Sequence, residues 1–242
     1  MIKYLPFDSE LFGYKVGEIA AGSAFSLHEV SKEAQLSSYK LVYIKSLIKI
    51  PGAKLTTPPY FDLVLADEKI TYQLPVSKTE ENGTFLPEPN IYLYTKSAPE
   101  TQLINLALQS GAFSRFATDP HFKNQEFQKL YSLWIYKLVT KELPEELWVY
   151  LKAENNLAGF FSIGFATATA TISLLAVAET VRRKGIGQAL LQVALTRARH
   201  QGCTTLRVIT QQANMPAVRF YEKAGFVRTN TVYLYHLWLP QS

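Results

Sequence analysis

The stretch Val181–Gln192, VRRKGIGQALLQ, places three cations and two glycines directly before an apolar helical pattern. A helix that begins at Gly185 leaves the N–H groups of its first turn without partners inside the helix, and these groups point at one spot. The charges of Arg182, Arg183 and Lys184 and the positive end of the helix dipole both favour an anion there. The segment therefore predicts a phosphate-binding loop.

Two common nucleotide-binding loops do not fit this segment. A dinucleotide loop needs a small residue three positions after its second glycine and an acid about twenty residues further on. Leu190 stands at the first position, and neither Asp nor Glu lies between Val181 and Gln212. A Walker-type loop needs Gly-Lys-Ser/Thr, which the sequence lacks. The phosphate therefore belongs to another kind of ligand.

A second motif follows at Asn214–Phe226, NMPAVRFYEKAGF. Each of its residues has an ordinary structural explanation: Asn214 as the cap of a helix, Tyr221 as a packed aromatic side chain, and Gly225 as the helix stop. The strand-like run TLRVIT lies between this motif and the loop. Taken together, the two motifs favour a shared ligand over three unrelated structural roles.

The two motifs, in this order and spacing, resemble the acetyl coenzyme A-binding motifs of the GNAT acetyltransferases. The resemblance implies an α/β (α+β) protein with the GNAT acyl-CoA N-acyltransferase fold and acetyl coenzyme A as cosubstrate. It implies that the strand around Leu175 pairs through its backbone with the pantetheine arm. The cofactor-binding residues that it implies are Leu175, Ala176, Val177, Arg182, Arg183, Lys184, Gly185, Ile186, Gly187, Gln188, Asn214, Ala217 and Tyr221.

The resemblance also gives Tyr221 a catalytic role. Transfer of an acetyl group from a thioester to an amine expels a thiolate, whose parent thiol has a pKa of about 8.5. A nearby proton donor helps this group to leave. In the family the tyrosine at this position commonly serves as that acid, so we expect Tyr221 to be catalytic. The sequence singles out no general base.

Further segments resemble the dTDP-fucosamine acetyltransferases within that superfamily: FDSELFG, GAFSRFATDPHF, TLRVITQQAN and YLYHLWL. Such enzymes acetylate the 4-amino group of a dTDP-linked 4-amino-4,6-dideoxy sugar. The resemblance implies a smaller N-terminal domain similar to a truncated GNAT fold. Arg115, Phe116 and Asp119 are the candidate acceptor-binding residues. An ion pair at the surface and a core aromatic side chain explain these three residues equally well.

Other functions stay open at this point. A GNAT enzyme that acetylates a peptide, a polyamine or another small amine would keep both motifs. A coenzyme A-binding module without catalysis is a second alternative, which Tyr221 disfavours. A nucleic-acid binder is a third, because Thr180–Asn230 holds nine Arg or Lys against one acid, Glu222. Base-stacking aromatic residues are absent from Arg182–Arg207, so we expect no nucleic-acid partner.

Periodicity and turn residues predict where the elements lie. Capping boxes at Ser26 and Ser97 predict two helices, the second running to about Gln109, and Asn124 begins an amphipathic helix. The expected strands lie at 40–50, 69–76, 91–96, 146–154 and 205–210, with two closing strands that end at 239. The segments 78–90 and 114–122 read as loops. We expect an N-terminal domain at 1–97 and a GNAT domain at 98–242.

Composition limits the cellular setting. The chain has 242 residues, 48% of them hydrophobic, and a net charge of +5. One cysteine and no Cys/His cluster predict a reducing compartment and no metal. The N-terminus lacks a secretory signal, so we expect a cytoplasmic protein. Leu157–Ala178 is uncharged, but its alternating Thr and Ala residues favour two buried strands over membrane insertion. A homodimer is compatible with the sequence.

Overall fold

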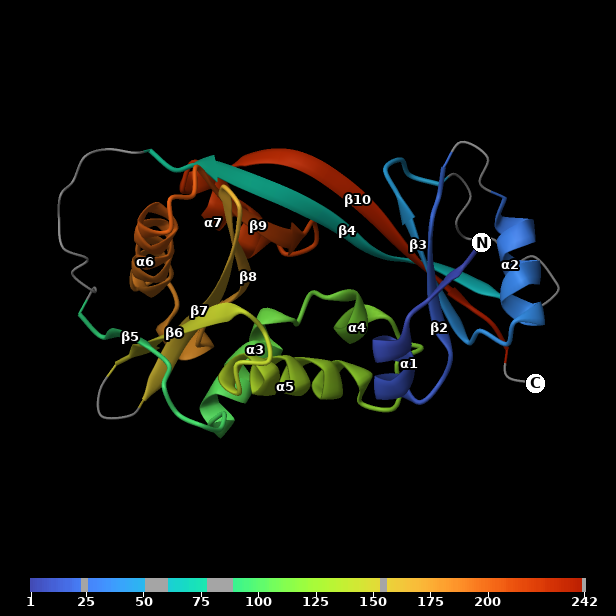
Figure 1. Ribbon diagram of the computed structural model, residues 1–242, viewed down its shortest axis with the longest axis horizontal. Helices are drawn as coiled ribbons and strands as arrows, with labels where there is room; N and C mark the ends of the chain where they lie inside the picture. The colour runs from blue at the N-terminus through green and yellow to red at the C-terminus, as the bar shows by residue number, and fades with distance from the viewer. Residues whose placement is uncertain (23–25, 51–60, 78–88, 153–155, 241–242) are drawn as a thin grey trace.

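The computed structural model describes residues 1–22, 26–50, 61–77, 89–152 and 156–240. Two bodies stand side by side and share two long strands, β4 and β10, that run from one body into the other (Figure 1). One body carries helices α1 and α2, and the other carries α3, α5, α6 and α7.

The elements follow one another in this order: β1 (Lys3–Tyr4), α1 (Pro6–Phe12), β2 (Val16–Ala20), α2 (Leu27–Leu36), β3 (Leu41–Ser46), β4 (Asp62–Pro75), β5 (Ile91–Leu93), α3 (Thr101–Ser110), α4 (Arg115–Thr118), α5 (Glu126–Val139), β6 (Glu145–Leu151), β7 (Leu157–Ala166), β8 (Thr169–Val177), the 3₁₀ turn η1 (Glu179–Val181), α6 (Ile186–His200), β9 (Thr205–Gln211), α7 (Met215–Lys223) and β10 (Val227–Trp238).

The strands of the described residues form one ten-stranded sheet in the order β1-β2-β3-β10-β4-β9-β8-β7-β6-β5. Two neighbouring pairs are parallel, β2 with β3 and β8 with β9. A single helix joins the strands of each pair, α2 in the first and α6 in the second. These are the crossovers that parallel pairing requires, and the fold is mixed α/β as the sequence predicts.

Strands β4 and β10 tie the two bodies together. β10 pairs with β3 at one end and with β4 along its whole length. The expectation of two closing strands is wrong, because a single strand runs from Val227 to Trp238 and has only a β-bulge against β4 near Asn230. Since β4 and β5 precede residue 97 and yet pair with β9 and β6, no gap in the sheet marks the 97/98 boundary, which stays a prediction.

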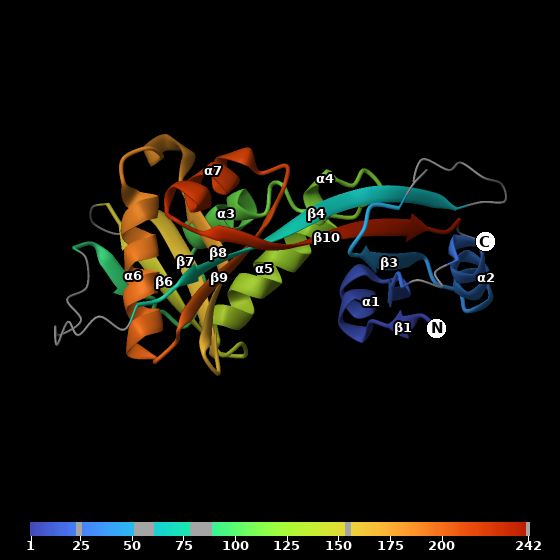
Figure 2. The same cartoon turned by 90° about the horizontal axis from the view of Figure 1, so that it is seen from above.

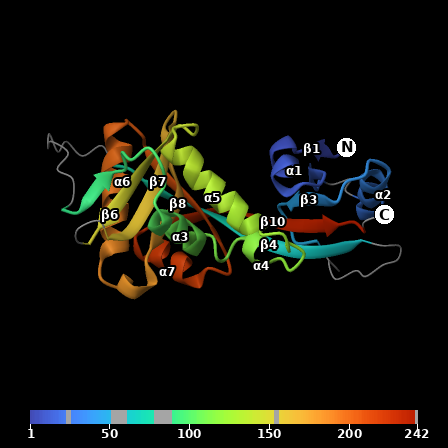
Figure 3. The same cartoon turned by 90° about the horizontal axis from the view of Figure 1, so that it is seen from below.

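Helices cover opposite faces of the C-terminal part of the sheet. α6 contacts strands β6 to β9 from one side, whereas α3 and α5 contact β6, β7 and β8 from the other (Figures 2 and 3). Gly159 of β7 lets α6 approach closely, because a Cβ atom there would lie 2.9 Å from the carbonyl oxygen of Ala176 and 3.1 Å from Leu190. The sheet therefore fixes the position of the first turn of α6.

The two predicted capping boxes have different outcomes. Ser26 caps α2, because its Oγ accepts a hydrogen bond of 3.3 Å from the N–H of Glu29. Ser97 caps no helix, since α3 begins at Thr101. Its expected partner Glu100 forms an ion pair with Lys96 and donates its own N–H to the Tyr94 hydroxyl. These contacts compete with the predicted capping box.

Two other predicted segments can be compared with the structure, and most of a third cannot. The uncharged stretch forms β7 and β8, as expected, and none of the helices in the described ranges is long and apolar enough to cross a membrane. The segment 114–122 holds one helical turn, α4, where a loop was expected. Most of the predicted loop at 78–90 lies outside the described residues.

Candidate active site

An open seam divides the sheet between β8 and β9. The two strands pair only from Thr169 to Ile172 of β8 and from Thr205 to Val208 of β9. Beyond these residues the two strands no longer pair: Ser173–Val177 of β8 and Ile209–Gln211 of β9 form no hydrogen-bonded pair with each other. We call the gap between these two segments the seam.

A β-bulge in β8 marks the start of the seam. Ser162 of β7 lies opposite Leu174, whereas its neighbour Ile163 lies opposite Ile172, so Ser173 is one residue in excess. The Ser173 hydroxyl donates a hydrogen bond of 2.9 Å to Oε1 of Glu145. Because a bulge bends its strand and raises the local twist, it accounts for the divergence of β8 from β9.

The seam exposes backbone groups of β8 that have no strand partner. The N–H of Ala178 donates to the carbonyl of Ala158 next to β7, at 2.9 Å. Successive residues of a strand direct their backbone groups to alternate sides, so Leu175 and Val177 direct theirs away from β7 and into the seam. The carbonyl of Val177 accepts from Nε of Arg182, at 3.0 Å. The seam can thus bind an extended polar chain by strand-like hydrogen bonds.

The glycine loop leads from the seam into α6. Arg183 and Gly185 have φ angles of 63° and 82°, a left-handed conformation that glycine adopts without strain. Gly185 is the N-cap of α6. Ile186, Gly187 and Gln188 then present the N–H groups of the first turn, which have no intrahelical acceptors. The predicted anion site therefore has the expected backbone geometry.

The cations of the loop differ in their contacts. Arg182 turns back onto the chain, because its guanidinium donates to Val177 and, at 3.4 Å, to the carboxylate of Glu179. Arg183 and Lys184 are exposed. Arg182 thus closes the loop, and the two exposed cations are available to a ligand.

Helix α7 carries the second motif. Asn214 is its N-cap, and its Oδ1 accepts from the N–H of Ala217 at 3.2 Å. Tyr221 is 5% exposed, and its ring packs against Tyr72, with the two ring centres 6.4 Å apart. Burial raises the pKa of Tyr221 above its ordinary value of 10. The hydroxyl therefore keeps its proton at physiological pH.

The loop, β8 and α7 meet at Gly187. A Cβ atom on this residue would lie 3.5 Å from the ring of Phe220 on α7 and 3.7 Å from Val177 at the end of β8. The structure thus brings the two sequence motifs together at the mouth of the seam.

Of the predicted acceptor residues, Arg115 and Phe116 lie in α4 and stack on each other. The guanidinium carbon of Arg115 is 4.5 Å from the ring centre of Phe116 and 3.7 Å from that of Tyr43. Phe116 also packs on Phe12, with 5.9 Å between ring centres. Phe116 thus belongs to an aromatic cluster of the N-terminal body and supports Arg115.

The prediction that Asp119 contacts the acceptor is not compatible with its surroundings. Its side chain is 0% exposed, and both oxygens are fully engaged. Oδ1 accepts from the N–H and Nδ1 of His121, at 3.0 and 2.8 Å. Oδ2 accepts from His236 and, at 2.9 Å, from Nε1 of Trp238. These four hydrogen bonds occupy both oxygens, so Asp119 holds His121, His236 and Trp238 in place.

The electrostatics of Asp119 and His236 fix a chain of hydrogen bonds that ends at Arg115. Burial alone would raise the pKa of Asp119, but hydrogen bonds from His236, His121 and Trp238 outweigh it and hold this pKa below its ordinary value. Burial lowers the pKa of His236 to about 4. A neutral His236 donates from Nδ1 to Asp119, so its Nε2 accepts from Nη1 of Arg115, 3.4 Å away.

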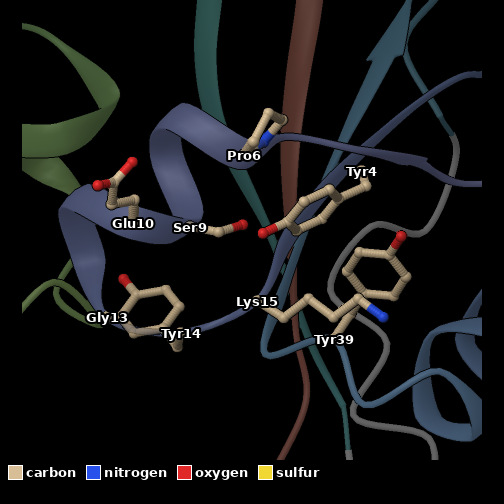
Figure 4. A pocket seen from close by; sticks show the side chains of 8 residues that line it. All are labelled: Tyr4, Pro6, Ser9, Glu10, Gly13, Tyr14, Lys15 and Tyr39. Atoms are coloured by element: carbon tan, nitrogen blue, oxygen red, sulfur yellow. The ribbon is translucent and has the colours of Figure 1, made fainter.

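A separate pocket of about 680 Å³ lies in the N-terminal body (Figure 4). Its lining comes from β1, α1 and the neighbouring loops, with Tyr4, Tyr14, Lys15 and Tyr39 around it. Its lining includes no predicted site residue, so the pocket is not part of the candidate active site.

Two features of the site were missed by sequence reasoning. The bulge at Ser173 had no signal, because the alternating pattern of β8 continues through it. The contact of Phe220 with the loop was also missed, although its place beside Tyr221 in the motif could have suggested it.

Comparison with known proteins identifies the family of the chain. The model of the acetyltransferase (GNAT) family matches residues 103–226. The dTDP-fucosamine acetyltransferase of Escherichia coli is 30% identical over 70% of this chain and 69% of its own. The spore coat polysaccharide biosynthesis protein SpsD of Bacillus subtilis is 26% identical over 85% of this chain and 61% of its own.

Solved structures support the fold. A conserved protein of unknown function from Staphylococcus epidermidis superposes with a TM-score of 0.61 at 14% identity, over 99% of this chain and 90% of its own. This likeness concerns the fold alone. Together with the family match it confirms the predicted GNAT fold.

The chain belongs to the GNAT acetyltransferase family and is an acetyltransferase. Members of this family use acetyl coenzyme A. The seam and the glycine loop suit that molecule, because they offer strand-like backbone groups to an extended arm and helix N–H groups to phosphates.

The lowered pKa of His236 predicts a pH-dependent stability. Between pH 6.5 and about 4 the unfolded chain binds a proton that the folded His236 does not accept. The contribution of His236 to the free energy of unfolding should therefore fall as the pH drops through this window, by at most roughly 3 kcal/mol. Asp67, whose pKa burial raises to about 6, contributes with the opposite sign in the same window. Urea unfolding of the wild type and of His236→Asn, measured at several pH values, checks this expectation.

The control is His28→Asn, which changes an exposed histidine. It should keep the pH dependence of the wild type, whereas His236→Asn should lose the contribution of His236 and gain stability relative to the wild type as the pH falls from 6.5 to 4. Equal slopes for all three proteins would show that His236 does not cause the effect.

Proposed function

We propose that this enzyme transfers the acetyl group of acetyl coenzyme A to the amine of a nucleotide-linked sugar, a dTDP-4-amino-4,6-dideoxyhexose. The observation that carries the proposal is the 30% identity to a dTDP-fucosamine acetyltransferase over 70% of the chain. The similarity to a polysaccharide biosynthesis protein over 85% of the chain supports it. The product would serve cell-surface polysaccharide synthesis in the cytoplasm. A homodimer stays a prediction.

Acetyl coenzyme A binds along the seam in this proposal. The backbone of Leu175 and Val177 pairs with the pantetheine arm, as a missing strand would. The N–H groups of Ile186, Gly187 and Gln188 hold the diphosphate, with the exposed Arg183 and Lys184 beside them. Of the other predicted residues, Ala176 is buried and faces β7 with its backbone, and Arg182, Asn214 and Ala217 shape the loop and α7.

Tyr221 supplies the proton in the transfer step. The neutral amine of the acceptor attacks the carbonyl carbon of the thioester, the C–N bond forms and the C–S bond breaks. The leaving sulfur takes the proton of the Tyr221 hydroxyl, and the amine nitrogen releases a proton to solvent. Because burial raises the pKa of Tyr221, this hydroxyl stays protonated over the whole range in which the amine becomes neutral.

Peptides, polyamines and other small amines remain the alternative acceptors, since they would use the same seam. The experiment that decides is an acceptor panel. Purified protein and acetyl coenzyme A are offered several dTDP-4-amino-4,6-dideoxy sugars, free amino sugars, peptides and polyamines, and thiol release is followed. We expect turnover with the nucleotide-linked sugars. Turnover with peptides or polyamines alone would refute the proposed acceptor and leave the acetyltransferase assignment intact.

Gly187→Ala should weaken acetyl coenzyme A binding about tenfold or more without loss of stability. The new methyl group makes ordinary contacts with Phe220 and Val177, so the free protein tolerates it. It narrows the mouth of the seam, through which the pantetheine arm must pass. Isothermal titration calorimetry measures the affinity, and thermal unfolding measures the stability.

Gly185→Ala is the matched comparison for this variant. Its φ of 82° places a side chain in the left-handed region, which costs about 1–2 kcal/mol. We therefore expect a lower melting temperature for Gly185→Ala and an unchanged or higher one for Gly187→Ala. Wild-type affinity in Gly187→Ala would argue against this path for the arm.

Tyr221→Phe should lower kcat about 10²–10⁴-fold and leave the Kd for acetyl coenzyme A nearly unchanged, because the hydroxyl acts on the leaving sulfur and not on the bound thioester. In the wild type the rate should rise with pH as the amine loses its proton. At pH values up to 10, the ordinary pKa of tyrosine, the rate should show no decline, because the pKa of Tyr221 is higher than that. Steady-state kinetics over pH check both expectations. Full turnover in the variant would reduce Tyr221 to a packing residue.

A further inference from the structure

One face of the sheet beside the seam is uncovered. Ile209 lies in β9, a central strand between β8 and β4, and yet 45% of its surface is exposed. Its partner across the pair, Thr71 of β4, lies on the same face. A central strand normally buries such a side chain on either a helix or a ligand. The exposed Ile209 therefore marks a surface that a bound molecule can cover.

Charged residues continue this face along β4. Asp67 and Lys69 share the side of Thr71, because they alternate with the core residues Ile70 and Tyr72. Lys69 pairs with Gln211 at the end of the seam, and Asp67 lies one step further toward the N-terminal body. From Thr71 to Asp67 the strand rises about 13 Å.

These charges lack the partners that buried charges usually have. Asp67 is 6% exposed, and its Oδ2 has no hydrogen-bond partner. Nε of Arg115 is buried and likewise without one. Among the described residues, no carboxylate forms an ion pair with Lys69 or Arg115.

The pKa values of Asp67 and Lys69 are both shifted toward the neutral form of the side chain. Burial, together with the nearby charge of Arg115, lowers the pKa of Lys69 to about 8. Burial raises the pKa of Asp67 to about 6, although Lys69 and Arg115 oppose the rise. Buried charges without direct partners destabilise a free protein, and they persist where a ligand uses them.

Arg115 is held firmly toward this face. Its guanidinium stacks over Tyr43 and Phe116, and its Nη1 contacts His236, which Asp119 holds. A planar guanidinium fixed in this way presents its remaining N–H groups in one direction, which suits a phosphate.

We propose that Lys69 and Arg115 bind the diphosphate of the acceptor, which lies along β4 with its amine at the seam and its nucleoside toward the N-terminal body. This inference rests on the proposed function. Lys69 and Arg115 carry one positive charge more than Asp67 balances, and a diphosphate carries at least two negative charges. The order along β4 sets the sugar over Thr71 and Ile209 and the phosphates beside Lys69 and Arg115.

The test measures binding of thymidine diphosphate by calorimetry in the presence of saturating coenzyme A, which occupies the loop at Arg182–Gln188. Lys69→Met and Arg115→Met should each weaken binding about 10- to 100-fold, the loss expected for a charged hydrogen bond. Lys129→Met, which removes an exposed cation of α5, is the control and should bind as the wild type does.

Stability separates a ligand-binding role of Lys69 from a structural one. Lys69→Met removes a partly buried cation that forms no ion pair with the described residues, so its melting temperature should equal or exceed that of the wild type. A structural role would lower it. The affinity for acetyl coenzyme A should stay unchanged.

The outcomes distinguish this inference from the proposed function. Wild-type affinity for thymidine diphosphate in both variants, or no binding to the wild type, overturns the diphosphate site. If nucleotide-linked sugars are still acetylated in that case, the proposed function stands. If Lys69→Met loses the binding and the acceptor panel shows turnover with peptides or polyamines alone, the site stands and the proposed acceptor is wrong.

Discussion

The divergence of β8 from β9 is the constraint on which the rest of the structure depends. A sheet that opens in its interior leaves backbone N–H and C=O groups without partners. Such groups destabilise the folded state when they are buried away from water. The bulge at Ser173 produces this opening, and the antiparallel pairing of β8 with β7 keeps the strand in place on its other side. The fold thus holds one strand edge open within a continuous sheet, where a ligand can complete the pairing.

The elements around the seam are held in place by a small number of packing contacts. Helix α6 packs on Gly159 and so brings its first turn to the end of β8. The side chain of Arg182 ties the loop to Val177, which sets the direction in which the chain enters α6. Helix α7 then places Tyr221 in a buried position against Tyr72 of β4. The glycine loop, the seam and Tyr221, which we propose as the anion site, the arm site and the proton donor, are therefore held by the same few packing contacts.

Strands β4 and β10 extend this arrangement into the N-terminal body. Because β10 pairs with β3 as well as β4, Tyr43 of β3, on which Phe116 packs, lies in the same sheet as the seam. The chain of hydrogen bonds from Asp119 through His236 to Arg115 lies at this junction. A neutral His236 lets the chain run in one direction, from the guanidinium to the carboxylate. The charged side chains at this junction therefore come from elements of both bodies.

The residues that we propose for the coenzyme side of the site were predicted from the sequence, whereas most of those that we propose for the acceptor side were not. The loop and α7 form short continuous motifs, because a positive φ at Gly185 and a cap at Asn214 impose residue types over a few neighbouring positions. The proposed acceptor face is assembled from side chains far apart in the chain, such as Lys69 on β4, Arg115 on α4 and His236 on β10. Charged residues that alternate with apolar ones are typical of a strand with one side exposed to solvent. The sequence pattern therefore gave no reason to select Asp67 and Lys69 as site residues. Asp119 was found for the wrong reason, since its four donors are visible only once the fold has brought them together. A local backbone conformation restricts the residue types at neighbouring positions and can be recognised in the sequence. A site built from side chains of distant segments is defined only by the tertiary structure.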